Sequence, residues 1–106
     1  MRNGILLTAA FMLCLAGATQ AAISSIDQVG QQFSKKTLSV KAGDTVRYQN
    51  GDDVTHNINI IDAADVTRDM GLQKPGEQIP VLFDKAGKFT VRCGIHPKMK
   101  MVVTAE

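Results

Sequence analysis

Four residues of metal-binding types fall in two short segments of the chain. Cys93, His96 and Met99 lie within one short stretch, and His56 lies far upstream of it. One thiolate and two imidazoles with a weak axial thioether form the ligand set of blue-copper electron-transfer sites. Thiolate and thioether suit Cu(I), whereas imidazole suits both oxidation states. The residue types therefore predict one copper ion that carries single electrons, with Met99 as the axial ligand.

The axial position has a second candidate, because Met101 follows Met99 closely in the sequence. A last strand that began after Met101 would have too few residues before Glu106 to close a sheet edge well. With Met99 as the ligand, residues 100–106 are free to form that strand, and Val103 takes an inward position. We favour Met99 on this ground, and Met101 stays the alternative.

Other chemistries for these side chains need partners that the sequence does not indicate. A Cys–His nucleophile needs a base oriented by a third group and an oxyanion site. A structural zinc site favours further thiolates or carboxylates, and methionine is not among its usual ligands. A lone histidine or methionine is usually a packing or surface residue, but both histidines of this chain belong to the copper set. The sequence therefore predicts a metal-binding redox protein and not an enzyme.

The N-terminal segment, residues 1–21, has the pattern of a secretory signal peptide. A basic head precedes an apolar run over residues 5–18, and small residues follow. The run is shorter than the roughly 20 residues of a membrane span, so an uncleaved anchor is the less favoured interpretation. We expect cleavage after Ala21, with Ala18 as the alternative. The mature domain would then cover residues 22–106 in the periplasm, with no stable membrane insertion.

The cysteine content and the charge of the mature chain limit its function further. Cys14 lies inside the apolar run, has no small residues before it as in a lipoprotein signal, and leaves with the leader. Cys93 then has no disulfide partner, and a metal is its natural occupant in an oxidising compartment. The formal net charge is +2 with Arg2 included, which is nearly neutral. Neither nucleic acid nor an anionic membrane is indicated as a partner.

Short alternating segments separated by turn residues dominate the mature chain. We expect strands at residues 37–41, 45–49, 56–61, 77–83, 88–93 and 100–106. Residues 63–72 are the exception and are expected to form a turn or two of helix in a surface connection between two sheets. Asp52 and Asp53 are interpreted as part of a turn. Strands at this spacing indicate an all-β sandwich or barrel, with Cys93 facing the core at the end of a strand.

Several segments resemble the plastocyanin, amicyanin and pseudoazurin group of cupredoxins. They are residues 40–46, the pair His56-Asn57 and residues 75–97. The Cys-x-x-His-Pro-x-Met spacing is most similar to the short ligand loop of amicyanin. The resemblance implies a cupredoxin-like Greek-key β-sandwich of about seven to eight strands with one type 1 copper ion and no other cofactor. It also implies a hydrogen bond from the Asn57 backbone N–H to the Cys93 sulfur.

The loop around His96 is the expected exit for the electron. In such folds His96 lies on an exposed loop, and Ile95 and Pro97 beside it form a small apolar patch of the kind that transient redox contacts use. Pro97 also stiffens the loop, because its φ is fixed and it has no N–H. We expect the protein to be a monomer. Its expected partners are redox proteins such as a cytochrome c or a periplasmic oxidoreductase. Lys98 and Lys100 either steer an acidic partner face or are ordinary solvated charges.

Two functions stay open on the sequence alone. An electron carrier needs a buried, pre-set site of four ligands, which is the pattern found here. A copper-trafficking protein, which delivers the ion itself, would use open and exchangeable Met and His sites. A link to methylamine oxidation would rest on family analogy alone, because a shared fold does not imply a shared function.

Overall fold

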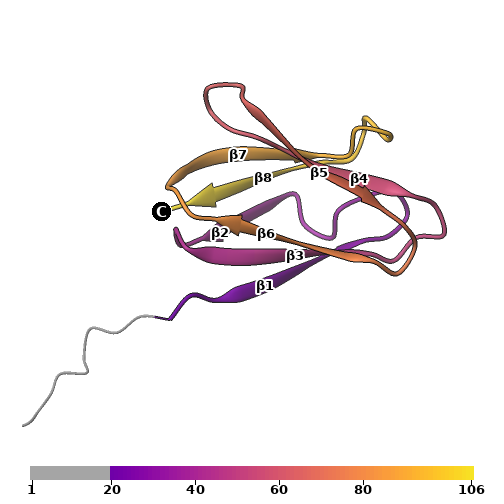
Figure 1. The fold of residues 1–106 in the computed structure, drawn as a ribbon, viewed down its shortest axis with the longest axis horizontal. Helices are drawn as coiled ribbons and strands as arrows, with labels where there is room; N and C mark the ends of the chain where they lie inside the picture. Colours follow the sequence, from indigo (N-terminus) through magenta and orange to yellow (C-terminus); the bar gives the residue numbers. More distant parts are fainter. Residues whose placement is uncertain (1–19) are drawn as a thin grey trace, which may run out of the picture.

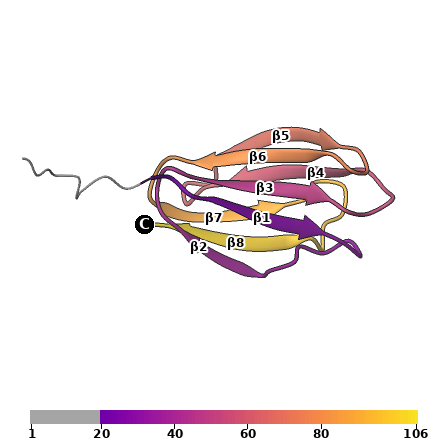
Figure 2. The same ribbon diagram turned by 90° about the horizontal axis from the view of Figure 1, so that it is seen from below.

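The structure, a computed structural model, describes residues 20–106, and every regular element in that range is a β-strand. A three-stranded sheet has the order β1-β3-β6, with β1 (Ile23–Gln28), β3 (Asp44–Asn50) and β6 (Gln78–Phe83). A five-stranded sheet has the order β2-β8-β7-β4-β5, with β2 (Thr37–Val40), β8 (Lys100–Ala105), β7 (Gly87–Arg92), β4 (His56–Ile61) and β5 (Thr67–Gln73). The two sheets stack as the layers of a sandwich (Figures 1 and 2). The predicted all-β sandwich is confirmed.

The expected helical excursion at residues 63–72 is wrong. Most of this segment is β5, which pairs antiparallel with β4 at the edge of the larger sheet. A tight turn precedes it, in which the Asp62 carboxylate accepts hydrogen bonds from the N–H groups of Ala64 and Val66. An exposed edge strand needs no continuous apolar face, so β5 lacks the alternation that marks the buried strands.

β1 is a further strand that the alternation pattern did not indicate. It pairs in parallel with β3, and Ile26 and Gln28 are its only buried side chains. Two inward residues are too few to produce a recognisable period along the sequence. The other expected strands are present with bounds that differ by no more than one residue.

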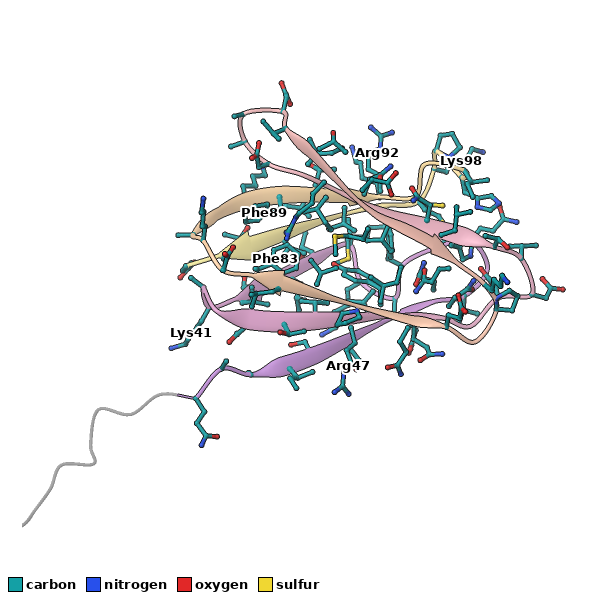
Figure 3. All side chains as sticks on the ribbon, in the orientation of Figure 1. Lys41, Arg47, Phe83, Phe89, Arg92 and Lys98 are labelled. Carbon is teal, nitrogen blue, oxygen red and sulfur yellow. The ribbon has the colours of Figure 1, made fainter. Side chains whose placement is uncertain are left out.

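The hydrophobic core fills the space between the two sheets. Tyr48 of β3 is fully buried there and meets Phe33 edge to face, with 5.8 Å between the ring centroids. Phe83 and Phe89 form a second such pair at 5.2 Å. Figure 3 shows these two rings between the sheets, whereas Lys98 lies on the loop at the far end of the sandwich. The Phe83–Phe89 pair thus packs away from the loop that holds Lys98.

The predicted leader lies almost wholly outside the described residues. Cys14 and the alternative cleavage point at Ala18 belong to the part that is not described. Among the described residues, none form a helix with the length and apolar character needed to cross a membrane.

Candidate metal centre

Three of the predicted ligands come together at one end of the sandwich. His56 begins β4, Cys93 directly follows β7, and His96 lies in the loop before β8. The two Nδ1 atoms are 3.1 Å apart, and the Cys93 Sγ lies 3.9 Å from that of His56 and 3.6 Å from that of His96. The donor atoms of the three residues thus form one cluster. His56 and Cys93 are buried, whereas His96 is half-buried.

Strand pairing explains why ligands so far apart in the sequence meet. β4 runs antiparallel to β7, with Asn59 opposite Arg92, so the beginning of β4 lies beside the end of β7. The pairing of β4 with β5 is irregular between Asn57 and Asn59. The extra residue of this irregularity lies on β5, because Ile58 of β4 faces both Met70 and Gly71. His56 and Asn57 can both contribute to the site although they are neighbours in a strand, because Asn57 reaches the Cys93 sulfur through its backbone N–H.

The Cys93 sulfur is held by a hydrogen-bond network centred on Asn57. The Asn57 N–H donates to the Cys93 Sγ at 3.3 Å, so the hydrogen bond that the resemblance implies is present. The Asn57 side chain accepts from the Gly94 N–H and donates to Asp69 Oδ1 and to the Gly71 carbonyl, each at 3.0 Å. A Cβ on Gly94 would lie 2.8 Å from the Asn57 Oδ1, so a larger residue here would have to displace the Asn57 side chain from its hydrogen bonds. The network fixes the loop against β4 and β5.

Both candidate axial methionines are buried, but their surroundings differ. Met99 is in the ligand loop, where its N–H donates to the His96 carbonyl at 2.9 Å and its carbonyl accepts from the Cys93 N–H at 3.3 Å. Met101 is in β8, and its sulfur accepts a hydrogen bond from the Tyr48 hydroxyl at 3.7 Å. Burial raises the pKa of Tyr48, so the hydroxyl stays protonated and remains a donor. Met101 therefore has a partner in the core, whereas Met99 is tied to the ligand loop.

Asp52 is a residue of the site that the sequence pattern did not indicate. Its Oδ2 accepts a hydrogen bond from the His56 Nε2 at 2.7 Å, although the sequence suggested only a turn. Burial tends to raise the pKa of Asp52, but hydrogen bonds from His56 and from the Gln31 and Gly30 backbone outweigh it and lower the pKa below its ordinary value. The carboxylate is therefore ionised at neutral pH. An aspartate four residues before a histidine is too common a spacing to have indicated this contact.

The donor set fits a copper ion. The Nε2 of His56 is hydrogen-bonded to Asp52, and the Nδ1 faces His96 and Cys93. Thiolate sulfur is a soft ligand and imidazole nitrogen a borderline one. This combination binds copper better than it binds cations that prefer oxygen ligands, such as Mg²⁺ and Ca²⁺. When bound in such a set, copper supplies reversible one-electron chemistry between Cu(I) and Cu(II). The Asn57 N–H spreads part of the thiolate charge, as surrounding donors do at metal sites generally.

A groove of 610 Å³ opens beside the ligand loop. Residues 30–33 line one side of it together with Lys36, and residues 95–100 line the other. Lys98 and Lys100 belong to the second side, so three lysines and no acidic side chain face the groove. Its charge is thus positive in a chain that is nearly neutral overall.

The comparisons with known proteins agree with this site. A family described as copper-binding proteins of the plastocyanin/azurin family matches residues 20–106. Chloroplastic plastocyanin from Chlamydomonas reinhardtii is 31% identical over 103 residues, which cover 89% of this chain and 71% of that protein. Methylamine utilization protein MauL from Methylophilus methylotrophus is 30% identical over 70 residues, or 62% of this chain and 39% of MauL. The Cu(I) structure of an amicyanin point mutant matches with a TM-score of 0.73 and 25% identity, covering 86% of this chain and 88% of amicyanin.

The family match extends over all described residues, including the three clustered ligands and the Asn57 network. The cupredoxin resemblance and the copper cofactor predicted from the sequence are therefore confirmed. Proteins of this family are electron carriers and not enzymes. With copper as its cofactor, the chain belongs to the plastocyanin/azurin family of copper-binding proteins.

Proposed function

We propose that this protein is a periplasmic carrier of single electrons that uses one type 1 copper ion held by His56, Cys93, His96 and Met99. The observation that carries the proposal is the clustering of three ligand atoms in a buried, hydrogen-bonded arrangement. Ligands that are fixed in advance move little when the oxidation state changes, which favours fast electron transfer. A trafficking protein would need ligands that open easily, and the buried His56 and Cys93 do not favour that role.

Addition of Cu(II) to the purified mature domain tests the proposal. We expect an intense blue thiolate-to-copper absorption band and a narrow EPR hyperfine splitting, because a thiolate in a compact N₂S set binds the ion. Reduction should bleach the colour and reoxidation should restore it, with the copper retained throughout in the presence of a chelator. A pale complex that readily gives up its copper would instead indicate trafficking.

The contacts of Ala22 support export with cleavage after Ala21. The Ala22 N–H donates to the Asp44 Oδ1 at 2.9 Å, and the Ala22 carbonyl accepts from the Thr45 N–H at 3.0 Å. Hydrogen bonds from Ala22 and Lys41 lower the pKa of Asp44, so its carboxylate is ionised. Cleavage of the peptide bond between Ala21 and Ala22 would place the new N-terminal ammonium group beside the Asp44 carboxylate, which is a favourable pairing.

The docking site that we propose for a redox partner is the face formed by Ile95, His96 and Pro97 together with the adjoining groove. Ile95 is 49% exposed, and an exposed apolar side chain beside a half-buried ligand suits a small and transient contact. Lys36, Lys98 and Lys100 border the same face without an acidic neighbour in the groove. The complementary partner is a redox protein with an acidic face, such as a cytochrome c or a periplasmic oxidoreductase of that charge.

Charge reversal at the groove should change the rate of electron transfer with charged reagents. We expect the Lys36→Glu/Lys98→Glu double variant to react about 10-fold more slowly with hexacyanoferrate and faster with hexaammineruthenium, because the local potential changes sign. The measurement is stopped-flow bleaching or recovery of the blue band at low and high salt.

The matched control is the Lys85→Glu/Lys88→Glu variant, which has the same net charge. Both lysines are exposed; Lys85 lies in the turn before β7 and Lys88 near the start of β7, at the end of that strand opposite to Cys93. The control variant should differ little from the unmodified protein with either reagent. Equal changes in the two double variants would show that net charge alone acts and would contradict the proposed docking face.

A further inference from the structure

We propose that Asp52 is a positioning residue that fixes the tautomer of His56 and lowers the reduction potential of the site, and that the turn at Gly30 and Gln31 holds it in place. The inference rests on the proposed copper site and adds a residue and a loop to it. Neither would be found from the four ligands alone, because the loop at residues 29–36 is distant from them in the sequence.

The two ring nitrogens of His56 face two different groups. Nε2 lies 2.7 Å from the Asp52 Oδ2, and Nδ1 lies 3.1 Å from the His96 Nδ1 and 3.9 Å from the Cys93 Sγ. An ionised carboxylate can only accept, so Nε2 must carry the proton and Nδ1 keeps a free lone pair. This tautomer is the one a metal ligand requires, and a partner on the second nitrogen also fixes the orientation of the ring.

The Asp52 carboxylate is itself held by the backbone. Its Oδ1 accepts from the Gly30 N–H at 2.6 Å, its Oδ2 accepts from the Gln31 N–H at 2.9 Å, and its own N–H donates to the Asn50 Oδ1 at 2.9 Å. Gly30 and Gln31 have φ values of 65° and 56°. Consecutive residues in such conformations direct neighbouring N–H groups at one anion, and a glutamine in this region of φ is uncommon. The turn therefore has the form of a cradle for this carboxylate.

The charge of Asp52 adds a second effect to its geometry. A neutral carbonyl could also accept the hydrogen bond from His56, but an ionised carboxylate makes the imidazole more basic. A negative charge near the centre stabilises the more highly charged oxidation state of the ion. Its removal should therefore weaken the binding of Cu(II) more than that of Cu(I).

The test compares Asp52→Asn with Asp53→Asn, which removes the same charge from the neighbouring exposed residue. We expect Asp52→Asn to lower the Cu(II) affinity by about 10–100-fold, the usual effect of altering a residue that orients a ligand. If the Cu(I) affinity changes little, the reduction potential rises by about 59 mV for each tenfold loss of Cu(II) affinity. Asp53→Asn should leave both quantities nearly unchanged. Competition titrations and voltammetry measure them.

A second measurement uses the metal-free protein and does not depend on copper binding. The ¹⁵N NMR spectrum of the histidine side chains should show His56 as the Nε2–H tautomer in the unmodified protein and in Asp53→Asn, and a mixture in Asp52→Asn. An Nδ1–H tautomer in the unmodified protein would overturn the proposal, as would equal potentials in the two variants. If the unmodified protein failed to form a blue copper site, the proposed function would fail, whereas this tautomer test would still decide the role of Asp52.

Discussion

Replacement of Cys93 by serine should abolish the intense blue absorption of the copper-loaded protein. The hydroxyl oxygen is a hard ligand that cannot replace the thiolate in either the charge-transfer band or the binding of Cu(I). Cys93 is 1% exposed and is the sulfur to which the Asn57 N–H donates, so no other group is placed to take over its role. The Cu(I) affinity should fall by more than about 100-fold, since altering a supporting residue alone costs about 10–100-fold.

Visible spectra and Cu(I) competition titrations measure these losses. The thermal unfolding of the metal-free Cys93→Ser variant is the control, because serine is nearly isosteric with cysteine and can still accept the hydrogen bond from Asn57. Its unfolding temperature should stay close to that of the unmodified protein. A serine variant that kept the blue band would contradict the assignment of Cys93 as the thiolate ligand.

Met99→Gln and Met101→Gln should separate the axial ligand from its neighbour in the core. We expect Met99→Gln to change the spectrum and lower the reduction potential, because the axial ligand tunes that potential and an amide oxygen is harder than a thioether. Met101→Gln should leave the spectrum nearly unchanged but reduce the free energy of unfolding by about 2 kcal/mol. The reason is that Met101 is 1% exposed, and the Tyr48 hydroxyl can satisfy only part of the hydrogen-bonding capacity of an amide.

Each methionine variant is the control for the other, since both make the same chemical change at a buried position. Voltammetry and visible spectra report on the metal, and urea unfolding of the metal-free proteins reports on the core. The reverse pattern, with a spectral change in Met101→Gln alone, would make Met101 the axial ligand and would give Met99 a packing role.

The sequence predicted the ligand-bearing strands well because they are the buried ones. β4 and β7 lie in the interior of the larger sheet, where alternating apolar residues are required on the core face. His56 begins β4 and Cys93 directly follows β7. Correct prediction of these two strands was therefore enough to predict that the two ligands meet. The two strands that were misread or missed, β5 and β1, lie at sheet edges, where few side chains are buried and the pattern weakens.

The surroundings of the ligands were harder to predict because they depend on contacts through space. Lys36 borders the groove, and Gly30 and Gln31 support Asp52, only because the connection between β1 and β2 passes beside the ligand loop. Neither the charge pattern nor the residue spacing indicates that approach. The axial role of Met99 rests on the length of the last strand and the geometry of the ligand loop, and it stays a prediction.

The Asn57 network also has a consequence for the order in which the chain folds and binds its metal. Its four hydrogen bonds join β4, β5 and the ligand loop through protein groups alone. In small zinc domains the metal supplies the folding free energy, so that chain and ion must assemble together. Because this network needs no metal, we expect the chain to fold first and to receive its copper ion later. Since His96 is the least buried of the three clustered ligands, we expect the ion to enter on the side of His96, which is also the side where we propose that a redox partner docks.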